Sequence, residues 1–394
     1  MTTRHAIAAH LKEARDAVGL TQASVAEALG LHRPAVSEIE AGRRAVSSEE
    51  LYRLAGLYGR TVAELLEGSA VTEVEQALFR ADTVVDPAAR VAVLAFAERC
   101  RTARALEAML GGRRAQGGPR AGAHEASPPR SPADAVRDGE RAAARERVRL
   151  GLGSEPVRDP VAVVEAQGLH VDSLDTDAPI DGVYFSTHRL GPCVGINPAR
   201  DRWTGYRTSF TVAHEYGHWL FGDIRAEVGA DTLRFTTDLR EIRANAFAAA
   251  FLLPRDGVMR YFAGADLLDD AGRLTTLNPA IVVRAMQHFG VSRQALLVRL
   301  VALGLVDRAV CDRPGIRDFA LRPVADALGL TLAVEHRLGA RFADLVARAW
   351  AGDHITTGRA AGLLGLGIEA FRERMAALGV AHTPAEDDDG LLVR

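Results

Sequence analysis

The stretch His214-Glu215-Tyr216-Gly217-His218 decides the fold of this chain of 394 residues. It lies inside the segment 207–221, whose apolar pattern predicts one helix. Two histidines at positions i and i+4 lie on one face of such a helix, so both imidazoles can reach a single metal ion. Glu215 is adjacent and can take a proton from a metal-bound water. The pattern H-E-x-x-H is typical of zinc peptidases and predicts a metal site in a cleft beside this helix.

The composition of the chain is that of an ordinary globular protein with room for two or three domains. Apolar residues make up 48% and charged residues 25% of the chain, and its net charge of -3 argues against a generally basic nucleic-acid coat. The three cysteines are far apart in sequence and form no C-x-x-C pair, which favours a reduced, cytoplasmic protein without cysteine metal ligands. No signal-like or membrane-spanning apolar run is present, so we expect no membrane partner.

Residues 5–67 carry the pattern of five short helices. Thr21 can cap a helix over 22–29, and Pro34 falls in the first turn of the next helix, where its missing N–H costs little. Ser47-x-x-Glu50 is a capping box for the fourth helix. The segment is therefore predicted to be an all-α domain.

This segment resembles the helix-turn-helix domain of phage-type (Cro/repressor, or XRE) regulators. The likeness is carried by Leu20-Thr21-Gln22, Val25-Ala26, Leu29-Gly30-Leu31, Val36-Ser37-Glu38-Ile39-Glu40, Gly42 and Arg43. The resemblance implies that the third helix enters the major groove of double-stranded DNA. The residues expected to face bases are Arg33, Ala35, Ser37 and Glu38, and those expected to contact phosphates are Gln22 and Arg43.

Two features depart from that family's pattern. His32 stands where the family usually has a serine or threonine cap, and residues 1–68 contain eight basic and nine acidic side chains. Weak non-specific affinity for DNA follows from this charge balance, and a homodimer on a palindromic site would compensate for it. A helical bundle that only mediates protein contacts is the alternative.

The middle of the chain is predicted to connect two domains. Residues 69–110 carry an apolar helical stripe that suits a dimerisation helix, a bridge or packing on the first domain. Residues 111–134 are rich in glycine, proline, serine and arginine, which predicts a flexible basic linker. Such a linker could place a peptidase cleft near a repressor on adjacent DNA, or let the cleft reach the linker itself.

Short strands are predicted over 169–171, 182–186 and 193–197, the last two as a hairpin. An exposed edge strand beside a metal cleft would hold an extended peptide, although packing alone explains these strands too.

A third metal ligand is needed, because catalytic zinc usually takes three protein ligands and keeps one position for water. Glu241 is one candidate, in a helix predicted over 238–253. Asp238-x-x-Glu241 is also a helix-capping pattern, and from the residues alone the ligand and cap interpretations are equal. Asp223 and Asp231 are further candidates.

The motif and the downstream helix together resemble the ImmA/IrrE family of metallopeptidases, whose members cleave repressor-type regulators in bacteria, their phages and mobile elements. Around the motif, the likeness is carried by Arg207, Phe210-Thr211-x-Ala213, Glu241-x-x-Ala244-Asn245-x-Phe247-Ala248 and Leu252-Leu253-Pro254, the last one position shorter than in the family. It covers about residues 135–305 and implies His214, His218 and Glu241 as ligands of Zn²⁺, with Glu215 as the general base. Asn245 would hydrogen-bond to a ligand, or else to the backbone of the preceding loop. A role for Tyr184 or Tyr216 in polarising a carbonyl stays unassigned.

The predicted fold class is α+β, with a zincin-like peptidase domain built from a small sheet and the H-E-x-x-H helix. Its parts are a helix-turn-helix domain at 1–68, a helical bridge at 69–110, a flexible linker at 111–134, the peptidase domain at 135–305 and a mainly helical region at 306–394. Within the last part a strand is expected over 330–335, and 357–371 is predicted as a helical pair that closes the core rather than a second helix-turn-helix.

The predicted function is a DNA-binding regulator fused to a zinc endopeptidase whose substrate is a repressor-type protein. The alternative is a transcription factor whose peptidase-like domain senses a ligand or stress and cuts nothing.

Overall fold

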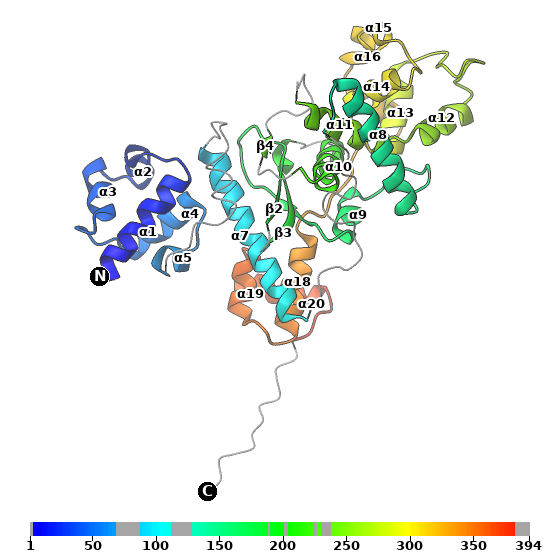
Figure 1. Ribbon diagram of the computed structural model, residues 1–394. Coiled ribbons are helices and arrows are strands. Elements are labelled where there is room, and N and C mark those ends of the chain that lie inside the picture. Colours follow the sequence, from blue (N-terminus) through cyan, green and yellow to red (C-terminus); the bar gives the residue numbers. More distant parts are fainter. Residues whose placement is uncertain are drawn as a thin grey trace.

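The structure is a computed structural model that describes residues 3–67, 87–111, 128–187, 190–200, 204–223, 227–229 and 238–382. Most of the predicted linker, Asp231 and the acidic run 386–389 lie outside these residues. Figure 1 shows a helical N-terminal unit, a small sheet with helices on both faces, and a group of C-terminal helices beside one end of α7. No helix in the described part of the chain has the length and apolar character needed to cross a membrane.

The N-terminal unit contains the five helices that the sequence predicted. They are α1 (Thr3–Ala17), α2 (Gln22–Leu29), α3 (Arg33–Glu40), α4 (Ser48–Tyr58) and α5 (Val62–Glu67). Thr21 accepts a hydrogen bond from the Ser24 amide, and Ser47 and Glu50 form the expected capping box of α4. His32 begins α3 without a side-chain cap, at the position where the family usually has a serine or threonine.

The sheet has four strands, β1 (His170–Ser173), β2 (Gly182–Thr187), β3 (Gly191–Ile196) and β4 (Glu227–Gly229), in the order β1-β3-β2-β4. β2 and β3 form the predicted antiparallel hairpin, with Tyr184 opposite Val194. β1 runs parallel to β3, and β4 runs antiparallel to β2. Both hairpin strands are therefore interior, and the edge beside β2 belongs to β4, which the sequence did not reveal.

The two faces of the sheet follow the alternation of side chains along the strands. Tyr184 and Val194 belong to the core that contains α10 (Tyr206–Phe221). Val183, Phe185 and Cys193 point the other way, into the core shared with α7 (Pro87–Met109). The sheet thus lies between α10 and α7.

Helix α7 also joins the sheet to the other parts of the chain. Arg99 of α7 binds the Asp172 carboxylate at 3.1 Å, which fixes the helix to β1. A Cβ on Gly59, at the end of α4, would lie 2.6 Å from the Val91 carbonyl oxygen, so the N-terminal unit packs directly on α7. The predicted bridging helix is therefore also a layer of the sheet domain.

Further helices complete the domain of α10. They are α8 (Pro132–Arg149), α9 (Pro160–Ala166), α11 (Leu239–Leu252), α12 (Arg255–Gly264), α13 (Pro279–Phe289), α14 (Arg293–Ala302), α15 (Arg308–Cys311), α16 (Pro314–Arg317) and α17 (Leu321–Ala327), with a 3-10 turn, η1, over Pro198–Arg200. Of these, α9 and α11 lie next to α10 itself. The buried side chains of α8, α9 and α11 to α16 form one continuous core with α10, and Leu321 of α17 packs against it.

The C-terminal helices α18 (Ala340–Ala351), α19 (Thr357–Leu363) and α20 (Ile368–Ala377) form their own core with the second half of α7. The pair α19 and α20 closes this core, as predicted. The strand expected over 330–335 is wrong. Its Val334 amide donates to the Thr204 carbonyl at 2.8 Å, so this segment lies against the loop before α10, whose described residues form no strand for it to pair with.

Candidate metal centre

Helix α10 holds the motif in the interior of the domain. Every residue of α10 except Arg207 is buried, and Gly222 ends the helix in a left-handed conformation. His214 and His218 are 2% and 8% exposed, so each ring needs a specific polar partner to offset its loss of water.

Three side chains converge at the motif. The Nε2 atoms of His214 and His218 are 3.0 Å apart. One oxygen of Glu241 lies 3.2 Å from Nε2 of His214, and its other oxygen lies 3.2 Å from Nε2 of His218. One ligand atom from each side chain falls within 4.8 Å of the others, and this is the only group of that kind among the described residues.

The carboxylates around the two histidines favour a cation there, whether a proton on His218 or a metal ion between the three side chains. Burial lowers the pKa of His218, but Asp223, Glu241 and Glu215 outweigh that effect and raise it to about 10. Burial raises the pKa of Glu241, but the two histidines outweigh it and bring the pKa far below the usual value. Two imidazoles and one carboxylate are also the donors that catalytic zinc sites use. The residues present therefore fit Zn²⁺.

The capping alternative for Glu241 does not match the geometry. Asp238 alone caps α11, accepting a hydrogen bond from the Arg240 amide at 2.8 Å. Glu241 instead extends toward the histidines, so the same short pattern supplies a cap and a candidate ligand from different residues.

Asp223 lies behind His218 and outside the converging atoms. Its Oδ2 is 3.0 Å from Nδ1 of His218, the nitrogen opposite the one that faces Glu241. Arg243, 3% exposed, donates to the other oxygen of Asp223 at 2.9 Å. The guanidinium carbon of Arg243 also lies 4.1 Å from the centre of the Phe221 ring. Asp223 is thus placed to orient His218, a role that the sequence did not suggest.

Glu215 lies where the sheet approaches α10. It is 8% exposed, and a Cβ on Gly182 would lie 3.3 Å from its Oε1 and 2.6 Å from Cγ2 of Thr211. A glycine at the start of β2 therefore makes room for the Glu215 carboxylate. Sequence reasoning missed Gly182, although a glycine inside a strand often marks a close approach of another group.

The other predicted residues of this region lie around the cluster. Tyr216 donates to Glu146 on the far side of α10 and stacks on Trp219, so it is not placed to polarise a substrate carbonyl. Tyr184 is buried against α10, and burial raises its pKa above the usual value. Asn245 is half-buried on α11, one turn beyond Glu241, and its hydrogen bond to a ligand stays a prediction.

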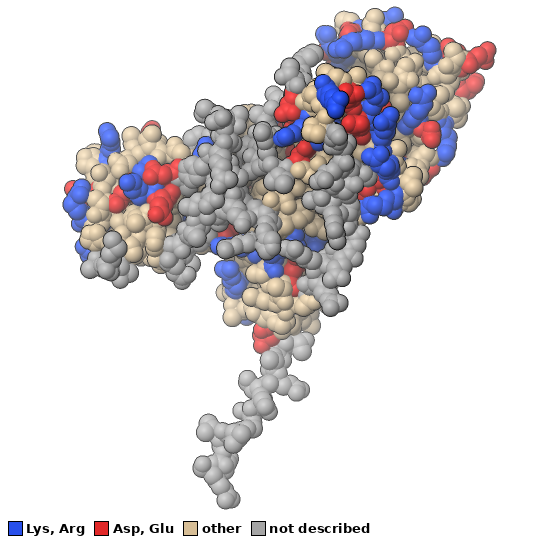
Figure 2. Space-filling model, viewed as in Figure 1, with Lys and Arg blue, Asp and Glu red and all other residues tan. Residues whose placement is uncertain are grey.

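In the N-terminal unit, Arg33, Glu38 and Arg43 are exposed, and Ala35 and Ser37 are partly exposed. Gln22 donates to Glu40 at 2.9 Å, and Glu40 also accepts from Nε of Arg15 at 2.6 Å. The nearly buried ion pair of Arg15 and Glu40 joins α1 to α3, and the hydrogen bond from Gln22 adds α2. Removing one partner of the ion pair would cost about 3–5 kcal/mol of stability. Figure 2 shows basic and acidic side chains mixed over this unit, in keeping with its charge balance.

The fold and the candidate site define a zincin-like, peptidase-type domain attached to a helix-turn-helix unit. Comparison with known families agrees with both parts. The family model described as "Helix-turn-helix" matches residues 11–65, and the peptidase M78 model described as "IrrE N-terminal-like domain" matches residues 164–301. No curated protein matches the chain. The predicted combination of an XRE-type helix-turn-helix with an ImmA/IrrE-type domain is thereby confirmed.

Proposed function

We propose that this chain is a DNA-binding regulator whose IrrE-like domain is a zinc-dependent endopeptidase. The observation that carries the proposal is the convergence of Glu241 of α11 on His214 and His218, which lie with Glu215 on the buried helix α10. Zinc bound there would polarise a peptide carbonyl and lower the pKa of a bound water.

Each residue of the site has its own role in the proposed reaction. His214, His218 and Glu241 hold the metal, and Asp223 fixes the ring of His218 by accepting the proton of Nδ1. Glu215 takes the proton from the attacking water and delivers it to the leaving amine. An extended substrate is held at the edge of β4, next to β2 and Glu215.

The proposed substrate is a repressor-type regulatory protein, as the family resemblance implies. Helix α3 brings the chain to double-stranded DNA, with Arg33, Ala35, Ser37 and Glu38 facing bases and Gln22 and Arg43 near phosphates. A homodimer on a palindromic site suits the weak charge of this unit. DNA binding also implies that the protein acts in the cytoplasm, where the chromosome lies.

Metal analysis of the full chain tests the site. We expect one zinc per chain, lost in His214→Ala and His218→Ala and kept in Glu215→Gln. Full metal occupancy in both histidine variants would refute the ligand assignment.

Cleavage is tested by mixing wild type with an equal amount of Glu215→Gln in the presence of zinc. A cut in wild type alone indicates self-cleavage in cis, and a cut in both indicates cleavage in trans. The same mixture is incubated with helix-turn-helix proteins encoded nearby. If zinc is bound and nothing is cut, the non-cleaving sensor becomes the better hypothesis.

A further inference from the structure

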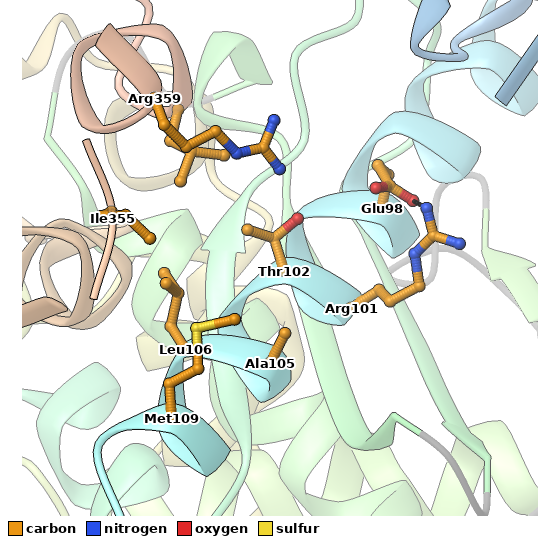
Figure 3. A pocket seen from close by; sticks show the side chains of 9 residues that line it. Glu98, Arg101, Thr102, Ala105, Leu106, Met109, Ile355 and Arg359 are labelled. Atoms are coloured by element: carbon orange, nitrogen blue, oxygen red, sulfur yellow. Dashed lines mark ion pairs between the residues drawn. The ribbon is translucent and has the colours of Figure 1, made fainter. Parts of the chain in front are cut away.

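A groove separates α7 from α19, on a part of the molecule that the proposed peptidase site does not use. Its volume is about 230 Å³, and Figure 3 shows Thr102, Ala105, Leu106 and Met109 of α7 along one side with Ile355 and Arg359 across from them. Met109 is 52% exposed, which is high for a large apolar side chain on a helix that is otherwise well packed.

The groove combines an apolar floor with positive charge at its rim. Arg101 is paired with Glu98 at 2.5 Å, so its charge is largely balanced. Arg359 is exposed, and no carboxylate in the described part of the chain pairs with its guanidinium. Such a surface fits a segment in which carboxylates are followed by aliphatic side chains.

The chain itself contains a segment with that chemistry. Glu386-Asp387-Asp388-Asp389 is followed by Gly390 and then Leu391-Leu392-Val393. The last described residue, His382, pairs with Asp353 at 3.1 Å, and its ring lies 5.1 Å from the ring of Trp350.

This exit point lies close to the groove. Trp350 donates to Thr357 of α19 at 3.1 Å, and Ile355 of the groove belongs to the turn between these two residues. The nine residues from His382 to Leu391 can span about 30 Å when extended, which is ample for this path.

We propose that residues 386–393 bind the groove between α7 and α19 of their own chain. The acidic residues pair with Arg359, and Leu391 and Leu392 cover the floor around Met109. The bound segment ties α19 to α7, the helix that carries both the sheet and the N-terminal unit. This proposal goes beyond the proposed function and does not depend on zinc or on cleavage.

Photo-crosslinking in the full chain tests the contact. A benzophenone amino acid replaces Met109, which is exposed, and the crosslinked peptides are identified by mass spectrometry. We expect crosslinks from position 109 to residues 383–394 of the same chain. Arg359→Glu should lower their yield about threefold or more, the size expected for losing surface ion pairs. Leu391→Ser should also lower it.

Arg372→Glu is the matched control, because Arg372 is exposed on α20 and does not line the groove. It should leave the yield unchanged. No crosslink to 383–394, or an equal loss in the two arginine variants, overturns the proposal. Mixing isotope-labelled and unlabelled chains separates one further outcome: crosslinks between two chains would show that a second copy occupies the groove and would overturn docking within one chain. All samples can be metal-free, so failure here is distinguishable from failure of the peptidase proposal.

Discussion

Substitution of Asp223 should weaken zinc binding although Asp223 is not one of the converging ligands. Its carboxylate holds Nδ1 of His218 at 3.0 Å and is held in turn by Arg243 at 2.9 Å. When a metal displaces the proton of Nε2, this pair would keep the other proton on Nδ1 and hold the ring with Nε2 directed at the site. Without the carboxylate, the ring of His218 can rotate and can adopt the other tautomer.

The size of the effect follows from the bond that is lost. A hydrogen bond to a charged group contributes about 1.5–3 kcal/mol, and each 1.4 kcal/mol is a factor of ten in affinity. Asp223→Ala should therefore weaken zinc binding about 10–100-fold, the range seen when such orienting partners are removed. Asp223→Asn should lose less, about tenfold, because the amide oxygen can still accept from Nδ1.

The assay is competition for zinc between the metal-free full chain and a chromophoric chelator near neutral pH. Asp256→Asn is the control. It removes one negative charge, as the Asp223 substitutions do, but from an exposed position at the start of α12. An affinity of Asp223→Ala within about twofold of wild type, or a loss no larger than that of Asp256→Asn, would show that Asp223 does not position His218.

Three further predictions concern other parts of the chain. Gly182→Ala places a methyl group 3.3 Å from Oε1 of Glu215 and 2.6 Å from a methyl group of α10, so the rate of peptide cleavage should fall while zinc affinity stays unchanged. Burial raises the pKa of Glu165 from 4.5 to about 7, so the folded chain holds a proton that the unfolded chain has released, and the free energy of unfolding falls as pH rises through this window. Glu165→Gln should therefore be more stable than wild type in denaturant melts at about pH 8 and no more stable near pH 4.5. Arg43→Ala should weaken binding to all DNA alike and lower the salt slope by about one, whereas Arg33→Ala should relax base preference and cost about 1–3 kcal/mol if Arg33 contacts a guanine.

The sequence predicted the elements that local chemistry determines. The caps at Thr21 and Ser47 mark helix starts because a side-chain oxygen there satisfies a free backbone amide. The spacing of His214 and His218 likewise follows from one helical turn. Glu241 was harder to assign, because a capping position and a ligand position coincide in sequence, and only the approach of α11 to α10 separates them.

The elements that the sequence missed depend on distant partners. β4 has three residues and is a strand only because β2 offers it an edge. Residues 330–335 have an apolar strand-like pattern but meet the loop before α10, which offers Val334 a single carbonyl. Asp223 was a candidate ligand in the sequence and Arg243 had no assigned role, because the contacts of both depend on the position of the His218 ring.

The place of α7 changes what the segment 111–134 can do. The sequence suggested a tether between a DNA-binding domain and a peptidase. In the structure, α7 before this segment and α8 after it both pack in the sheet domain, and the N-terminal unit contacts α7 itself. The segment therefore connects two layers of one domain. A cut within it would leave α7 held by Arg99 and by the buried side chains Val93 and Phe96, so cleavage there would not by itself release the DNA-binding unit. Release of the DNA-binding unit by self-cleavage would instead require a cut before α7. If the substrate is a separate repressor, no cut in this chain is required.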